Sequence, residues 1–428
     1  MASLVALAMA GGPLFVQELQ RAWDEGDAVL PIDPRLPEVG VRRLVAALRP
    51  ASMVDADGSR RRLADGVAVE PGDALVMATS GTTGDPKGCV LTHAAVAASA
   101  RATSDRLGVD PEVDRWLACL PLSHVGGLSV VTRALVTGTP LSVHPGFSAK
   151  AAADAVRSEG VTMVALVATA LRRVDAGTFR TVVLGGSAPP AELPGNAVTT
   201  YGMTETGSGV VYDGWPLDGV EIEVVPAVPG PGSGRPRSGR PGSGRREPGP
   251  VPGPAPGSGV ARAAGAVGAS EGEIHLRGPM LVRAYRQCGA STDGRDPDLY
   301  QDPKSADGWL ATGDWGVLSA DGRLSVLGRL SDLVITGGEN VWPAAVEEAL
   351  QCLPGVAAVA VGGRPDPEWG QRVVAWIVPA DPLDPPTLES LRARVAEELP
   401  RFAAPRELVL VNSLPRTSLG KVTRYQLA

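Results

Sequence analysis

A run rich in glycine, hydroxyl and lysine side chains, TSGTTGDPKG at residues 79–88, could surround a phosphate group. Its glycines let the backbone approach a ligand closely, its hydroxyls and backbone N–H groups can donate hydrogen bonds, and its lysine adds positive charge. No G-K-[S/T] ends the run, so it is not a Walker loop. We expect an apolar strand before it and a helix after it. The residues predicted to bind phosphate are Thr79, Ser80, Gly81, Thr82, Thr83, Gly84 and Lys87.

A second motif, YGMTETG at residues 201–207, could contact a nucleotide and its metal ion. Tyr201 can lie against an adenine ring, and Thr204 can donate to the α-phosphate. Glu205 offers the hard oxygen ligand that Mg²⁺ prefers. Taken alone, a Thr-Glu pair after a strand is more typical of a helix cap.

Three further motifs follow: ATGDWG at 311–316, GRLSDLVITGGENVWPAAVEE at 328–348 and PRTSLGK at 415–421. Asp314 in the first can accept hydrogen bonds from ribose hydroxyls, and Arg329 in the second can assist there. In this order the five motifs resemble those of the adenylate-forming superfamily, which includes acyl-CoA synthetases, peptide-synthetase adenylation domains and luciferases. The resemblance implies an α/β fold: a large multi-layer N-terminal domain with parallel-strand sheets, and a small mobile α+β C-terminal domain.

The same resemblance implies ATP and Mg²⁺ as cofactors, CoA as co-substrate, and a role for each matching residue. Lys421 would bridge the substrate carboxylate and the α-phosphate, neutralising charge as the pentacoordinate phosphorus forms. Ser331 would be the hinge between two domain poses, although the family usually has Asp or Lys there. The further residues implied for ATP are Gly185, Gly186, Ser187, Thr200, Gly202 and Met203, and those for CoA are Gly337, Gly338 and Glu339.

Two histidines have alternative interpretations. His124, in LPLSHVGGL, resembles the family's gate at the floor of the acyl pocket and is equally consistent with a buried structural histidine. His93 is predicted to start a helix. The acyl pocket itself is expected near residues 122–127 and 167–170, whose side chains are too generic to predict specificity.

Composition excludes several classes of protein. A net charge of -7 without a basic stripe argues against nucleic-acid binding. The four cysteines form no C-x-x-C pair, so we expect reduced thiols in a cytoplasmic protein. The apolar N-terminal run MASLVALAMA lacks the basic start of a signal peptide, and we predict a buried helix there. No apolar stretch reaches the roughly 20 residues needed to cross a bilayer. We expect a monomer or a homodimer.

Short apolar runs that alternate with helix-length segments predict crossover connections, and hence parallel strands covered by helices. The predicted strands here are 74–78, 116–120, 161–167 and 181–184, and the predicted helices are 93–107 and 151–159. Residues 1–329 are assigned to the large domain. Residues 330–428 form the small one, with the pattern helix 343–353, strands 356–361 and 372–378, helix 387–399 and strand 408–411.

A Gly/Pro/Arg-rich segment at 226–270 should be disordered, because it has almost nothing to bury. It interrupts a predicted strand pair, 220–225 and 273–276. Lengthening such a loop costs only about 0.6 kcal/mol per doubling, so a neutral insertion is favoured over a functional tether.

The chain has only about seventy residues before the phosphate loop, fewer than many relatives. In this it resembles short actinobacterial ligases similar to o-succinylbenzoate:CoA ligase of menaquinone biosynthesis. The resemblance extends to residues 200–220, 370–378 and 404–422. It implies o-succinylbenzoate as the substrate. Medium-chain or aryl acids, and transfer to a carrier protein instead of CoA, remain as alternatives.

Overall fold

The computed structural model describes residues 2–80, 86–187, 189–190, 192–226, 269–287, 299–416 and 422–427. Its first sheet has eight strands in the order β17-β16-β6-β5-β2-β1-β3-β4. Strands β1, β2, β3 and β5 run parallel, and the others pair antiparallel. The bounds are β1 Leu4–Ala8, β2 Ala28–Pro31, β3 Ser52–Asp55, β4 Arg60–Arg62, β5 Asp73–Ser80, β6 Pro86–Thr92, β16 Ala284–Arg286 and β17 Tyr300–Gln301.

The N-terminal apolar run is a strand, so the prediction of a helix there was wrong. Strand β1 lies between β2 and β3, and its residues Leu4 to Leu7 are fully buried. A strand covered on both faces shows an unbroken apolar run rather than alternation, and a run this short does not reveal its period. Helices α1 (Pro13–Asp24) and α2 (Glu38–Leu48) connect β1 to β2 and β2 to β3.

The second sheet has seven strands in the order β13-β12-β11-β10-β9-β7-β8, and it is parallel from β8 to β11. Its strands confirm the predicted apolar runs at 116–120, 161–167 and 181–184. The bounds are β7 Trp116–Ala118, β8 Leu141–Val143, β9 Met163–Leu166, β10 Thr181–Leu184, β11 Ala197–Gly202, β12 Gly209–Tyr212 and β13 Trp215–Pro216.

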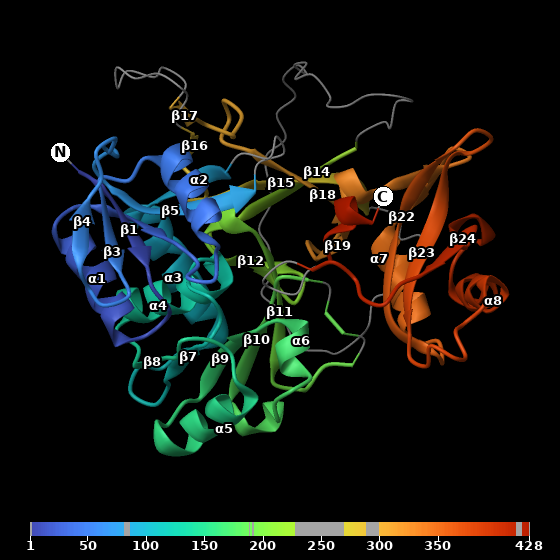
Figure 1. Cartoon of the computed structure of the whole chain (residues 1–428), viewed down its shortest axis with the longest axis horizontal. Helices are drawn as coiled ribbons and strands as arrows, with labels where there is room; N and C mark the ends of the chain where they lie inside the picture. The colour runs from blue at the N-terminus through green and yellow to red at the C-terminus, as the bar shows by residue number, and fades with distance from the viewer. Residues whose placement is uncertain are drawn as a thin grey trace.

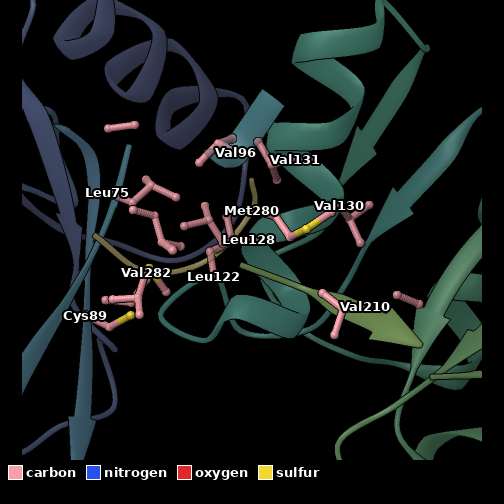
Figure 2. Packing of buried hydrophobic residues seen from close by; sticks show 14 of the residues in the cluster. Leu75, Cys89, Val96, Leu122, Leu128, Val130, Val131, Val210, Met280 and Val282 are labelled. Carbon is pink, nitrogen blue, oxygen red and sulfur yellow. The ribbon is translucent and has the colours of Figure 1, made fainter. Parts of the chain in front are cut away.

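Two helices lie between these sheets. Helix α3 (His93–Leu107) contacts β5 and β6, while α4 (Val125–Thr137) packs on α3 and contacts β7 and β9. The predicted helix 93–107 is therefore confirmed, with the Thr92 side chain accepting a hydrogen bond from the Ala95 N–H at its start. The predicted helix 151–159 is α5 (Ala149–Ser158), and a short α6 (Ala168–Leu171) follows β9. Figure 2 shows Leu75, Val96 and Leu128 packed together where these elements meet.

The third sheet has the order β14-β15-β18-β19, with bounds Glu221–Val225, Ser270–Arg277, Leu310–Leu318 and Leu324–Arg329. Strands β14 and β15 pair antiparallel from Glu221↔Arg277 to Val225↔Glu273, which confirms the strand pair predicted on either side of the Gly/Pro/Arg-rich segment. Residues 227–268 of that segment lie outside the described residues.

The C-terminal part forms a separate α+β domain around its own hydrophobic core. Its sheet contains β20 (Val334–Thr336), β21 (Glu339–Val341), β22 (Val356–Asp366), β23 (Gly370–Pro379) and β24 (Glu407–Leu410). Helices α7 (Pro343–Gln351) and α8 (Leu388–Glu398) complete the predicted pattern. In Figure 1 this domain, orange to red, lies on the opposite side of the molecule from the N-terminal sheet, in blue. No helix in the described residues is long and apolar enough to cross a bilayer.

Candidate nucleotide and carboxylate site

The phosphate-loop motif spans the turn of a hairpin. Strands β5 and β6 pair antiparallel up to Thr79↔Lys87 and Ser80↔Pro86. Thr79 Oγ1 donates to the Lys87 carbonyl at 3.3 Å. Residues 81–85, which include the predicted Gly81, Thr82, Thr83 and Gly84, lie outside the described residues. Strand β6 (Pro86–Thr92) lies between the loop and the predicted helix, which begins at His93 as α3.

Glu205 lies in a tight turn, η2 (Thr204–Thr206), directly after β11. The turn is fixed by the buried Thr206, whose hydroxyl donates to the carbonyl of Ser208 at 2.6 Å and accepts from the Met203 N–H at 2.9 Å. The alternative interpretation of the Thr-Glu pair as part of a helix cap also fits, because Thr204 and Glu205 open a single 3-10 turn whose first N–H is capped by Thr206.

The Glu205 carboxylate is held by a residue that the sequence motifs did not indicate. Tyr285, on β16, donates its phenol O–H to Glu205 Oε1 at 2.6 Å. The Lys87 ammonium lies 5.7 Å from the centre of the Tyr285 ring. The structure thus places the Lys87 ammonium near the Tyr285 ring and the Glu205 carboxylate at the hydroxyl of the same side chain.

Tyr201 and Asp314 are joined across two sheets. The Tyr201 hydroxyl donates to Asp314 Oδ2 at 2.8 Å, and Arg329 Nε lies 3.1 Å from Asp314 Oδ1. Burial and the neighbouring Asp314 carboxylate raise the pKa of Tyr201, so its phenol stays a donor. These three residues, predicted to hold the adenine and the ribose, form one connected group.

The glycine-rich turn after β10 lies directly against Thr200. The Thr200 hydroxyl donates to the Leu184 carbonyl at 3.1 Å. A Cβ on Gly185 would lie only 2.7 Å from Thr200 Oγ1, and Gly186 has a left-handed φ of +85°. Only glycine fits this turn without displacing β11, which carries Thr200 and Tyr201. Ser187 follows in the same turn.

His124 precedes α4 and is largely buried, which lowers the pKa of its imidazole, although the Asp33 carboxylate acts in the opposite direction. A small pocket opens beside it, between β5, α3, α4 and the end of the 201–207 motif. Its lining includes Leu75, Val96, Ser99, Leu128, Arg133 and Gly207. Part of the predicted acyl-pocket range, at Val125, contributes to this lining.

Arg133 is the one charged residue in that lining, and sequence reasoning missed it. Its side chain is 2% exposed, donates through Nη2 to Ser208 Oγ at 3.2 Å and lies 4.8 Å from the Trp116 ring centre. Its Nε and Nη1 have no hydrogen-bond partner among the described residues. The only indication of this residue in the sequence is a single arginine within the otherwise uncharged run GGLSVVTRALV.

The C-terminal domain carries the remaining predicted residues. Ser331 lies in the turn η3 (Leu330–Asp332), directly after β19. Gly337 and Gly338 form the β20–β21 turn with φ of +60° and +83°, and Glu339 begins β21.

Lys421 lies outside the described residues, but the chain on both sides of it is placed. Arg416 and Val422 form an antiparallel bridge. Arg424, a second residue that the motifs did not indicate, lies close to the predicted hinge. It donates to Asp332 Oδ2 at 3.0 Å and through Nη2 to both oxygens of Glu347, at 2.6 and 2.8 Å.

The oxygen atoms of the site suit a magnesium ion that binds together with a nucleotide. In the described residues, no group of three or more His, Cys, Asp or Glu side chains could hold a metal by itself. Mg²⁺ is usually bound by one or two carboxylates together with substrate phosphates and water. Glu205 supplies one such carboxylate, because no described residue hydrogen-bonds its Oε2.

Comparison with known proteins gives a consistent set of relatives. The family model of the AMP-binding enzyme matches residues 6–286, and that of the AMP-binding enzyme C-terminal domain matches residues 345–421. A probable 2-succinylbenzoate–CoA ligase of Mycobacterium tuberculosis is 36% identical over 436 residues, covering 97% of this chain and 94% of that protein.

Two solved structures of the o-succinylbenzoate CoA synthetase of Bacillus subtilis are also similar. The complex with ATP and magnesium has a TM-score of 0.77 at 25% identity and covers 99% of this chain and 89% of that one. The complex with the acyl-adenylate intermediate has a TM-score of 0.71 at 26% identity and covers 99% and 88%.

Proposed function

The chain belongs to the AMP-binding enzyme family, and we propose that it activates 2-succinylbenzoate with ATP and transfers the acyl group to CoA. It is an AMP-forming acid:CoA ligase that uses ATP, Mg²⁺ and CoA. As the sequence resemblance implies, the thioester would be used in menaquinone biosynthesis. Within this proposal, residues 1–329 bind the nucleotide and the acid, and residues 330–428 supply Lys421 and the CoA-binding turn.

The reaction has two steps. A carboxylate oxygen attacks the α-phosphorus of ATP, the bond to pyrophosphate breaks, and an acyl adenylate forms. The CoA thiol then attacks the acyl carbon, loses its proton and releases AMP. The carboxylate is already a nucleophile, so catalysis consists of holding it in line and neutralising charge.

Each step can be assigned to residues of this chain. Lys87 and Lys421 supply positive charge to the phosphates and to the attacking carboxylate. Tyr201, Asp314 and Arg329 hold the nucleoside end. Bound Mg²⁺, held by Glu205, neutralises phosphate charge when the nucleotide is present.

The proposed choice of substrate rests on Arg133, which lines the pocket. 2-Succinylbenzoate has two carboxylates, and only one can be adenylated at a time. The other must be held away from the α-phosphate and needs charged donors. Arg133 has two buried nitrogen atoms without partners and lines the same pocket as Gly207, which is two residues beyond Glu205. The pocket has about 10 Å³ of free volume, enough for about one water molecule, so it must widen to admit a carboxylate. A guanidinium matches a carboxylate in geometry as well as in charge.

An assay of AMP and thioester formation over a panel of acids tests the proposal. The panel contains 2-succinylbenzoate, monocarboxylic aryl acids and medium-chain acids. Turnover of 2-succinylbenzoate should exceed that of every monocarboxylate. Loss of a buried, hydrogen-bonded charge pair costs about 2 to 5 kcal/mol, so Arg133→Met should lower kcat/KM for 2-succinylbenzoate by about 10²-fold or more. The KM for ATP should not change. Preferred turnover of a monocarboxylate, or an Arg133→Met enzyme with unaltered kcat/KM, would refute the assignment.

The thiol acceptor is tested in the same assay. AMP release that depends on CoA supports a CoA ligase. AMP release that depends instead on an added phosphopantetheinylated carrier protein would replace this proposal with the carrier-loading alternative.

A further inference from the structure

Tyr285 occupies a position between two oppositely charged residues of the nucleotide site. It lies on β16, which pairs antiparallel with β6 so that Tyr285 faces Cys89 and Arg286 faces Gly88. Side chains on a strand alternate between its two faces, so Lys87 and Cys89 share the face on which Tyr285 lies. This register explains why the Lys87 ammonium lies 5.7 Å from the Tyr285 ring centre.

The backbone around Glu205 is already fixed without Tyr285. Thr206 pins the turn from one side through its bonds to Ser208 and Met203. On the other side the Val282 N–H donates to the Glu205 carbonyl at 2.6 Å. What these bonds leave undetermined is the direction of the Glu205 carboxylate.

That direction is set by the phenol of Tyr285. Its O–H donates to Glu205 Oε1 at 2.6 Å, a short charge-assisted bond. With Oε1 engaged in this way, Oε2 is the oxygen available to a cation.

The alternative partner for Glu205 is the Lys87 ammonium, which lies 5.7 Å from the centre of the Tyr285 ring. Opposite charges in a partly buried site attract strongly. An ion pair between them would remove from the site both the charge that faces phosphate and the charge that faces the metal.

We propose that Tyr285 is a positioning residue that aims the Glu205 carboxylate at the divalent cation and keeps it apart from Lys87. The inference rests on the proposed function only in that ATP binds with a metal ion at Glu205. Tyr285 itself touches neither reacting group.

Binding of ATP by isothermal titration calorimetry tests this without any turnover. Each enzyme is titrated with ATP in Mg²⁺ and again in EDTA, with no carboxylic acid present, and the ratio of the two affinities is the metal-dependent gain. A hydrogen bond to a charged group contributes about 1.5 to 3 kcal/mol, so Tyr285→Phe should reduce this gain by about tenfold or more. Its affinity for ATP in EDTA should not fall.

The matched control is Tyr300→Phe. Tyr300 lies on β17 in the same sheet, and its hydroxyl accepts a hydrogen bond from Arg286 Nη1 at 2.8 Å rather than contacting Glu205. This variant should keep the full gain. Glu205→Gln should abolish the gain, and the double variant Glu205→Gln with Tyr285→Phe should behave as Glu205→Gln alone.

Three results would overturn the proposal: a full gain in Tyr285→Phe, an equal loss in Tyr300→Phe, or a gain that survives Glu205→Gln. The assay of acid turnover is independent of these titrations. A wild-type enzyme that shows the Tyr285-dependent gain and forms no thioester from 2-succinylbenzoate would refute the proposed function and leave the role of Tyr285 intact.

Discussion

Replacing two buried arginines with methionine should change stability in opposite directions. Arg286 is 0% exposed and fully engaged: it donates to the carbonyls of Leu48, Val67 and Ala68 and to the Tyr300 hydroxyl. Arg286→Met removes the donor from the buried Leu48 carbonyl and from the part-buried Val67 and Ala68 carbonyls. A buried unsatisfied acceptor costs about 1 to 3 kcal/mol and each lost part-buried bond about 0.5 to 1.5 kcal/mol, so we expect a loss of roughly 2 to 6 kcal/mol in the free energy of unfolding.

Arg133 is equally buried but only partly satisfied. Arg133→Met loses the bond to Ser208, about 1 kcal/mol, and the contact with the Trp116 ring, about 0.5 to 2 kcal/mol. It also removes two buried nitrogen atoms without partners, each costing about 1 to 3 kcal/mol. The balance runs from about 1 kcal/mol against the variant to about 4.5 kcal/mol in its favour, and most of this range favours the variant.

Thermal unfolding of the ligand-free enzymes, followed by tryptophan fluorescence at one protein concentration, measures both effects. At about 2 to 4 °C per kcal/mol, Arg286→Met should melt well below the wild type and Arg133→Met at or above it. An Arg133→Met enzyme that melts as far below the wild type as Arg286→Met would show that Arg133 is a structural residue. The substrate assignment would then lose its main support.

Three further predictions concern the C-terminal domain and the insert. Lys421→Ala should slow adenylation, measured as pyrophosphate release, by about 10² to 10³-fold. It should affect thioester formation from preformed acyl adenylate far less. Equal losses of rate in the two steps would contradict the role assigned to Lys421. Burial raises the pKa of Glu347 and Arg424 opposes this, so Arg424→Ala should raise it further. A carboxyl group whose pKa is raised in the folded state stabilises the fold at low pH, and this stabilisation is lost as the pH rises through that folded-state pKa. The amount by which Arg424→Ala lowers the melting temperature should therefore be larger at neutral pH than at about pH 5. In a Glu347→Gln background this pH dependence should disappear. Deleting residues 230–264 should leave kcat unchanged, because a long loop adds little closure cost, and a large loss would indicate a functional tether.

Much of the fold was predictable because its helices and strands show clear periods and boundaries. Helix α3 begins at His93 and ends at Leu107 as predicted, since Thr92 caps its start and Gly108 ends it. The prediction of a helix at the N-terminus was wrong because a fully buried strand and a buried helix give the same short apolar run.

The site was predictable only where its residues lie within motifs. Tyr201, Asp314 and Arg329 were each named from a motif, and the structure joins them through hydrogen bonds and an ion pair. Tyr285 and Arg133 were missed because their partners are far away in sequence. Tyr285 lies 80 residues from Glu205, and Arg133 lies 75 residues from Ser208. Only the pairing of β16 with β6 and the packing of α4 bring these residues to the site.

The contrast between the two buried arginines also bears on what the pocket binds. The arrangement around Arg286 shows that this fold can surround a buried guanidinium with enough acceptors. A protein retains an under-satisfied buried charge at a cost in stability, and such departures from full satisfaction concentrate at functional sites. The missing partners of Arg133 must accept hydrogen bonds, because a guanidinium only donates. A carboxylate oxygen or a water molecule can accept these bonds and an alkyl chain cannot, so Arg133 favours a dicarboxylate substrate over a fatty acid.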